Sequence, residues 1–83
     1  MDKGIENCRA AIEAIRLLLE RQPYSGLAHY DLGTLYLKID DYSGALEQHR
    51  ILKVLNEDLA AKLLDQIFPA LGKAKNSGTS EAR

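Results

Sequence analysis

A spacing of 34 residues constrains the fold of this chain more than any other feature of its sequence. Six residues of the segment 11–18 recur, identically or conservatively, 34 positions later: Ala11, Ile12, Glu13, Arg16, Leu17 and Leu18 return as Ala45, Leu46, Glu47, Arg50, Ile51 and Leu52. Between the two copies stands the motif His29-x2-Leu32-Gly33-x2-Tyr36. A period of this length is typical of helix–turn–helix units that stack on their neighbours. The spacing therefore predicts an all-α array of antiparallel helical hairpins.

The length of the chain leaves little room for a core. A chain of 83 residues forms one small domain, and such a domain buries only about 60% of the surface that its unfolded chain exposes. Small domains gain stability from disulfides, metal ions or oligomerisation. Cys8 is the single cysteine, and the sequence has no ligand cluster for a structural zinc. We therefore expect no metal or cofactor, and we expect self-association or partner binding instead.

Charge and hydropathy argue against two classes of partner. The net charge is −1 with acidic and basic residues interleaved, whereas a nucleic-acid binder needs a basic face. No apolar run approaches the roughly 20 residues that cross a bilayer. The first residues, Met-Asp-Lys-Gly, lack the layout of a secretory signal. Together with the lone thiol, these features predict a cytoplasmic protein that binds no nucleic acid and does not insert into a membrane.

Apolar periodicity predicts four helices. They cover residues 2–22, 26–39, 42–55 and 57–71. Each has a residue suited to capping its N-terminus, in the order Asp2, Ser25, Asp41 and Asn56. Loops of two to four residues make consecutive helices antiparallel neighbours. Gly33 costs about 1 kcal/mol relative to alanine in a helix interior, so we expect it to mark a close approach between helices.

Pro69 falls inside the apolar pattern of the fourth helix. Proline lacks the backbone donor and clashes with the preceding turn, so it should kink the last turn or end the helix near Phe68. From Gly72 onward the sequence is polar and aperiodic, which is typical of a disordered segment. The predicted organisation is a helical domain at 1–71 followed by a flexible polar tail at 72–83.

These motifs resemble the tetratricopeptide repeat family. The family's first helix reads W-x2-L-G-x2-Y, against His29-x2-Leu32-Gly33-x2-Tyr36 here, and its second reads A-x3-F, against Ala45-x3-His49. The turn Asp41-Tyr42 also matches the family's common corner. The resemblance covers residues 5–71 and implies one full repeat, at 26–59, flanked by two half repeats.

The sequence departs from the family pattern at three positions. His29 and His49 replace large apolar residues, which bears on how tightly the repeat packs. Glu57 stands where the family closes a repeat with proline. This substitution favours a smoother connection between the third and fourth helices and leaves open whether the two are continuous.

The resemblance implies a concave groove lined by the first helix of each repeat. By family register, the groove residues from the second predicted helix are Leu27, Tyr30, Asp31, Thr34, Leu37 and Lys38. The fourth helix would continue the groove with Ala61, Leu64, Asp65 and Phe68. The basic and amide residues that clamp a C-terminal carboxylate are absent, so the groove favours a helix or an extended peptide. The alternative is that Tyr30 and Leu37 pack against a neighbouring helix.

The chemically reactive side chains all favour structural roles. His29 and His49 occupy packing positions of the repeat. We do not expect them to combine with Cys8 as the three or four ligands that a zinc ion needs around it. Cys8 lies on an apolar stripe, where a thiol is buried and inert. The repeated charges fit a solvated face rather than a catalytic pair: Glu13, Arg16, Glu47 and Arg50. We see no nucleophile–base pairing and therefore expect no catalysis.

Both terminal helices carry more apolar residues than one packed face can absorb. The excess on the fourth helix includes Leu64, Ile67, Phe68 and Leu71. The first helix has a similar excess at Leu17 and Leu18. Exposed apolar patches usually mark interfaces, and helical arrays normally end in polar caps. We therefore expect self-association through a terminal helix or a partner docked there.

Together, these features predict a non-catalytic module that binds a protein or peptide partner. One alternative is a structural homo-oligomer or assembly subunit, such as a homodimer, in which the terminal helices mate and the groove is unused. A second alternative is an accessory protein or chaperone for one client. Burial of Leu64 and Phe68 between copies would favour the first alternative, whereas protection of Tyr30 and Leu37 by a client would favour the second.

Overall fold

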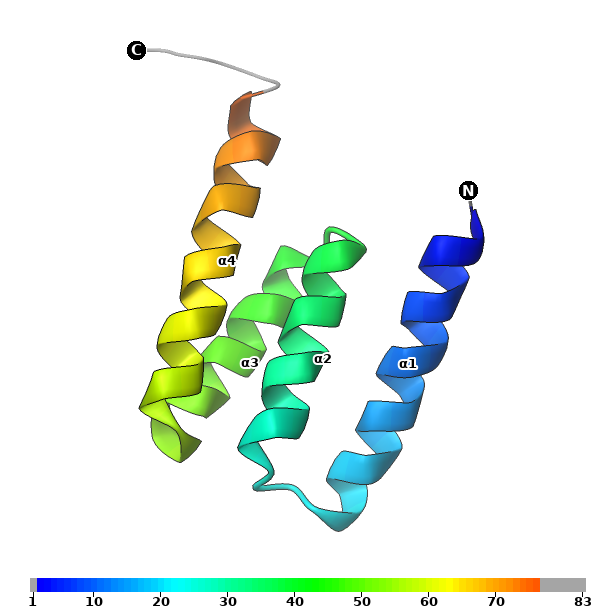
Figure 1. Ribbon diagram of the computed structural model, residues 1–83, viewed down its shortest axis with the longest axis vertical. Helices are drawn as coiled ribbons and strands as arrows, with labels where there is room; N and C mark the ends of the chain where they lie inside the picture. Colours follow the sequence, from blue (N-terminus) through cyan, green and yellow to red (C-terminus); the bar gives the residue numbers. More distant parts are fainter. Residues whose placement is uncertain (1, 77–83) are drawn as a thin grey trace.

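The computed structural model describes residues 2–76, with side chains from residue 4 to residue 72. It contains four helices: α1 (Asp2–Arg21), α2 (Gly26–Lys38), α3 (Tyr42–Leu55) and α4 (Glu57–Asn76). Consecutive helices run in opposite directions (Figure 1). The predicted all-α arrangement of helical hairpins is confirmed, and no strand occurs within residues 2–76. None of the helices described is long and apolar enough to cross a membrane.

The second helix is the centre of the arrangement. α2 packs against each of the other three helices, and α3 also packs against α4. Among the four helices described, α1 packs against α2 alone (Figure 1). The most deeply buried cluster lies where α3 meets α4 and consists of Ala45, Leu52, Ala60, Leu63 and Ile67. One terminal helix therefore lies at the edge of the molecule, whereas the other contributes to its core.

Three of the four predicted caps are confirmed. Ser25 Oγ accepts a hydrogen bond from the Ala28 amide at 3.2 Å, and Asp41 Oδ1 accepts one from the Gly44 amide at 2.9 Å. Asn56 Oδ1 accepts from the Leu59 amide at 3.1 Å. These side chains satisfy amide groups that have no partner within the first turn of a helix.

α1 begins at Asp2. The side chain of Asp2, which the sequence predicted as the fourth cap, lies outside the described side chains. At the other end, α1 finishes at Arg21, and α2 finishes at Lys38 rather than Ile39. These shifts of one residue leave the hairpin arrangement unchanged.

The connection between α3 and α4 is a sharp break at one residue. Asn56 has φ −162° and ψ 97°, an extended conformation. Its amide donates to the Leu52 carbonyl at 2.7 Å, while its side chain caps α4. The smoother connection expected from Glu57 is therefore wrong. A single asparagine ends one helix and starts the next, so no proline is needed there.

The fourth helix continues through Pro69 to Asn76. The predicted end near Phe68 or Leu71 is therefore wrong. Proline at position 69 leaves the Asp65 carbonyl without its helical donor, but Ile67 and Leu71 on either side of it pack against the core and hold the helix. Residues 72–76 of the predicted tail are helical, and residues 77–83 lie outside the described residues.

Candidate interaction surfaces

The face of α2 that points away from its neighbours is narrow and mixed in character. Leu27 is 67% exposed at its N-terminal end, and Asp31 and Lys38 are also exposed. Thr34 is half-buried, and its hydroxyl donates to the Asp31 carbonyl at 2.8 Å. Four of the six predicted groove residues therefore share this face and leave their side chains open to contact.

The two remaining predicted groove residues, Tyr30 and Leu37, belong to the packing between helices. Both are half-buried against the core cluster. The Tyr30 hydroxyl accepts a hydrogen bond from Gln66 Nε2 of α4 at 2.6 Å. The alternative interpretation, that these side chains pack against a neighbouring helix, describes them correctly.

The fourth helix does not continue the α2 face as the family register implied. Gln66 is the α4 residue that reaches Tyr30. Residues two positions apart on an α-helix point about 200° apart, so Leu64 and Phe68 point away from the side that Gln66 presents to α2. Phe68 is 62% exposed and Leu64 is half-buried. They form a separate surface on α4.

One predicted self-association residue is wrong. Ile67 is completely buried in the core cluster. Its side chain is covered by the same chain, so it is not available to a second copy. Leu71 is half-buried against the same cluster. The exposed apolar surface of α4 is therefore centred on Phe68 and Leu64, with the exposed Ala61 one turn earlier.

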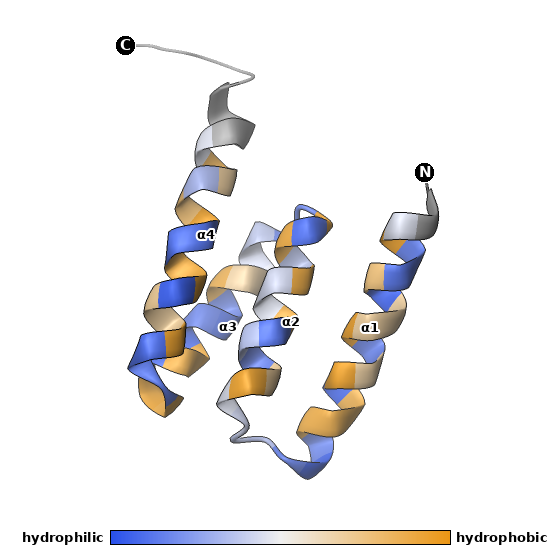
Figure 2. Cartoon of the chain, viewed as in Figure 1, coloured by the Kyte–Doolittle hydropathy of each residue, from blue (hydrophilic) through white to orange (hydrophobic). Residues whose placement is uncertain are grey.

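The first helix has two apolar sides, of which only one is covered. Ile12 is buried, and it lies with three half-buried residues on the side that faces α2: Cys8, Ile15 and Leu19. Ile5, Leu17 and Leu18 are 45%, 56% and 41% exposed. Hydrophobic residues recur along the length of both α1 and α4 (Figure 2), and Phe68 on α4 is 62% exposed. The predicted excess of apolar residues on the terminal helices is therefore exposed.

Comparison of this chain with family models, curated proteins and solved structures finds no match. The surfaces must therefore be interpreted from their own chemistry.

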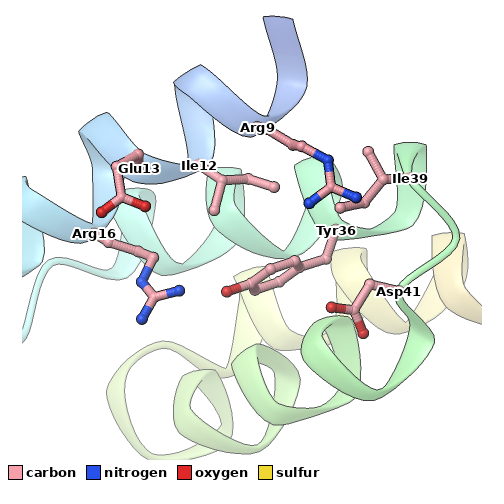
Figure 3. A pocket seen from close by; sticks show the side chains of 7 residues that line it. All are labelled: Arg9, Ile12, Glu13, Arg16, Tyr36, Ile39 and Asp41. Atoms are coloured by element: carbon pink, nitrogen blue, oxygen red, sulfur yellow. The ribbon is translucent and has the colours of Figure 1, made fainter. Parts of the chain in front are cut away.

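A polar cleft lies between α1 and the C-terminal end of α2 (Figure 3). Its volume is about 270 Å³, and its lining consists of Arg9, Ile12, Glu13, Arg16, Tyr36, Ile39 and Asp41. No carboxylate among the described residues lies within salt-bridge distance of Arg9 or Arg16. Sequence periodicity missed this cleft, because it depends on the angle between α1 and α2.

The cleft carries charges of both signs. The side chains of Arg9 and Arg16 extend from α1 toward the region of Tyr36 (Figure 3). Asp41 is already engaged, since it caps α3. Glu13 and Arg16 were predicted to lie on a solvated face, and both are exposed at the rim. Their repeat counterparts, Glu47 and Arg50, form an exposed ion pair at 3.8 Å.

A second cleft, of about 320 Å³, is largely apolar. It lies between the α1–α2 loop and the C-terminal half of α3, and its lining consists of Pro23, Tyr24, His29, Ile51, Val54 and Leu55. Tyr24 and Val54 at its edge are 81% and 86% exposed. The cleft is open rather than enclosed, so it offers a shallow apolar surface instead of a pocket for a small molecule.

Both histidines are engaged in hydrogen bonds that link elements. His29 is 7% exposed. Its Nε2 donates to the Pro23 carbonyl at 2.8 Å, and its Nδ1 lies 2.6 Å from the side-chain oxygen of Gln48. His49 Nδ1 donates to the Ala60 carbonyl at 3.0 Å. These contacts are structural, as the packing positions predicted.

Cys8 is half-buried where α1 faces α2. Its thiol is more accessible than the fully buried group that the sequence predicted. Among the described residues, no group of three or more His, Cys, Asp or Glu side chains is arranged to hold a metal ion. The surfaces that stand out are therefore the bare apolar faces of α1 and α4.

Proposed function

We propose that this chain is a non-catalytic helical module of the tetratricopeptide type that binds proteins, further copies of itself included, through its terminal helices. One observation carries the proposal. Large apolar side chains on α1 and α4 lie on sides that none of the described helices covers, namely Leu17, Leu18 and Phe68.

Physical chemistry explains why these faces favour association. Burial of a leucine or phenylalanine side chain contributes about 1.5–3 kcal/mol, and contiguous exposed apolar surface in a small domain usually marks an interface. A chain of 83 residues also has little core of its own. Burying the exposed apolar faces of α1 and α4 in an interface would therefore raise the free energy of unfolding above that of the monomer.

Several local features support the tetratricopeptide interpretation. The chain turns between α2 and α3 at Asp41, which is the turn position of the family motif. α2 approaches its neighbours closely at Gly33, which is the glycine of that motif. The exposed α2 face offers a second, smaller contact surface for a peptide. The proposal includes a reducing, cytoplasmic setting, in which the half-buried Cys8 remains a thiol.

Sedimentation velocity on the full chain tests this function. We expect the average mass to rise between micromolar and millimolar concentration. Replacing Leu17 and Leu18 together by serine should weaken association at least tenfold, because about 1.4 kcal/mol corresponds to a factor of ten. Val54→Ser is the matched control, since Val54 is 86% exposed but belongs to α3.

Two results would contradict the proposal. One is a monomer at every concentration. The other is an equal loss of association in the Val54→Ser control, which would mean that general surface hydrophobicity, rather than the terminal helices, drives contact.

A further inference from the structure

The 34-residue repeat shows which side of α1 lacks a packing partner. In α3, the most deeply buried residues lie on the side that packs against α2 and α4: Ala45, Gln48 and Leu52, at 0%, 7% and 0% exposure. Gln48 contacts His29 and lies beside Gly33, both in α2. The residues 34 positions earlier in α1 are Ala11, Ala14 and Leu18. Ala14 is exposed and Leu18 is 41% exposed, because no helix precedes α1 in the described chain to cover them.

A second comparison, between α4 and α2, shows which side of α4 lacks a packing partner. It aligns the helix caps rather than the 34-residue spacing, because residues 22–25 join α1 to α2 whereas Asn56 alone joins α3 to α4. Placing the cap of α4, Asn56, on the cap of α2, Ser25, matches Ala61, Leu64 and Phe68 with Tyr30, Gly33 and Leu37. In α2 these positions are covered by α3 and α4, since Tyr30 bonds to Gln66 of α4 and a Cβ at Gly33 would meet both Leu63 of α4 and Gln48 of α3. In α4 they form the bare face, because no helix follows it in the described chain.

The two bare faces are complementary in kind. α1 corresponds to α3, and among the described residues no helix stands before it to complete a hairpin. α4 corresponds to α2, and within residues 2–76 no helix stands after it. We propose that copies of this chain join head to tail, with α4 of one copy and α1 of the next packing as an antiparallel pair equivalent to α2–α3. This inference rests on the proposed function and specifies its partner as a second copy.

Side-chain size fits this pairing. In α3, Gly44 lies under the ring of Tyr36, and a Cβ there would lie 2.8 Å from the ring. The residue 34 positions earlier is Ala10, and with Ala14 it forms a strip of small residues along the bare side of α1. Phe68 and Leu64 supply bulk on the opposing face of α4. In the proposed pairing, the large side chains of α4 therefore pack against the small side chains of α1.

Charge fits the antiparallel direction. The bare face of α1 ends in its last turn with Arg21, and the bare face of α4 begins in its first turn with Glu57. In the α2–α3 pair, the start of α2 lies beside the end of α3, where Gly26 approaches Asn56. The same arrangement between copies brings Arg21 to the partner's Glu57. An exposed pair of this kind adds little free energy, so it sets direction rather than strength.

A head-to-tail contact joins two different surfaces, which distinguishes it from a symmetric dimer. The test uses two full-length variants, Ala14→Arg on α1 and Phe68→Arg on α4. Both positions are exposed in the monomer, and circular dichroism with thermal melting checks that each variant keeps the helical content of the unmodified chain. Sedimentation velocity then gives the mass of each variant alone and of their equimolar mixture.

We expect each variant alone to be a monomer and the mixture to form a dimer that does not grow further. Each variant has lost one face, so the mixture retains one intact α1 face and one intact α4 face. A variant that still dimerises alone, or a mixture that stays monomeric while the unmodified chain associates, would overturn the head-to-tail pairing but leave the proposed function standing. A monomeric unmodified chain at millimolar concentration would overturn both.

Discussion

Leu63 of α4 packs against the backbone of Gly33 in α2. A Cβ atom at Gly33 would lie 2.5 Å from Leu63 Cδ2 and 3.4 Å from the Cβ of Gln48. Leu63 is completely buried, so its side chain has little room to move away. The glycine therefore sets the distance between two helices that are not consecutive in the chain.

Gly33→Ala should lower the free energy of unfolding by about 1 kcal/mol. Overpacking a core costs about 1–3 kcal/mol, and it outweighs the gain in helix propensity of about 1 kcal/mol. Urea denaturation followed by circular dichroism measures the change. Leu63→Ala should cost less in the Gly33→Ala background than in the unmodified chain, because the two side chains compete for the same space. A net stabilisation by Gly33→Ala would contradict this account.

Two adjacent aspartates should respond to substitution with opposite signs. Asp40 has φ 62°, and the amides of Asp40 and Asp41 donate to the carbonyls of Leu37 and Tyr36 at 3.0 and 2.8 Å. This is the hydrogen-bond pattern that usually places glycine in the left-handed position after a helix. Asp40→Gly should therefore stabilise the fold by about 1 kcal/mol, because glycine avoids the penalty that an L side chain meets in the left-handed region. Asp41→Ala should destabilise it by about 1 kcal/mol, since it removes the cap of α3.

Thermal melting of the two variants beside the unmodified chain checks both signs. If Asp40→Gly melts lower than the unmodified chain, the left-handed residue is not a source of strain, and the interpretation of the turn fails.

Local chemistry explains which parts of the fold the sequence predicts well. Ser25, Asp41 and Asn56 act through hydrogen bonds to amides a few residues away, so their roles can be predicted from neighbouring residues alone. The same holds for Gly33, whose cost in a helix demands a compensating contact. These predictions need no knowledge of how the helices are oriented.

Tertiary packing explains which predictions fail. Leu63, Leu64, Ile67 and Phe68 are all apolar, and periodicity alone gives no basis for deciding which of them faces α2 and α3. The structure buries Leu63 and Ile67 and exposes Phe68. Pro69 stays within a helix because contacts on both sides of it override its low propensity. The polar cleft at Arg9 depends on the angle between α1 and α2. That angle cannot be predicted from the residues of either helix taken alone.

His29→Leu should lower the free energy of unfolding by about 2 kcal/mol. It leaves the Pro23 carbonyl and the buried Gln48 without their partner, and an unsatisfied buried polar group costs about 1–3 kcal/mol. Adding Gln48→Met should recover part of the loss, because replacing both partners by apolar groups removes one unsatisfied group. Urea denaturation of the single and double variants measures this. A double variant less stable than His29→Leu would contradict the expected coupling.

The stability of the fold should fall at alkaline pH through Tyr42. Partial removal from water raises the pKa of its phenol above the ordinary value of 10.0, and the charge of Asp40 and their hydrogen bond at 3.2 Å raise the pKa further. The folded chain then favours the neutral phenol. This contribution is complete at neutral pH and is lost as pH rises past 10.0 and through the raised pKa.

Titration of tyrosinate by ultraviolet absorbance, compared between the unmodified chain and Asp40→Asn, tests this effect. The Asp40→Asn difference spectrum should show one tyrosine titrating at lower pH, because the neighbouring negative charge is gone. Tyr42→Phe is the control that assigns the shifted titration. An unchanged titration curve in Asp40→Asn would mean that Asp40 does not act on the phenol.

Pro69→Ala should stabilise α4 by about 1–3 kcal/mol. Proline in a helix interior costs about 3 kcal/mol relative to alanine, since it lacks the donor to the residue four positions earlier. The Asp65 carbonyl would regain that donor. Pro69 is exposed, so little packing is lost on substitution. Circular dichroism should show higher helical content and a higher melting temperature. Ala70→Pro, at a half-buried neighbouring site, is the opposing control and should destabilise the helix. If Pro69→Ala left both helical content and melting temperature unchanged, the helix beyond Phe68 would contribute nothing to the stability of the fold.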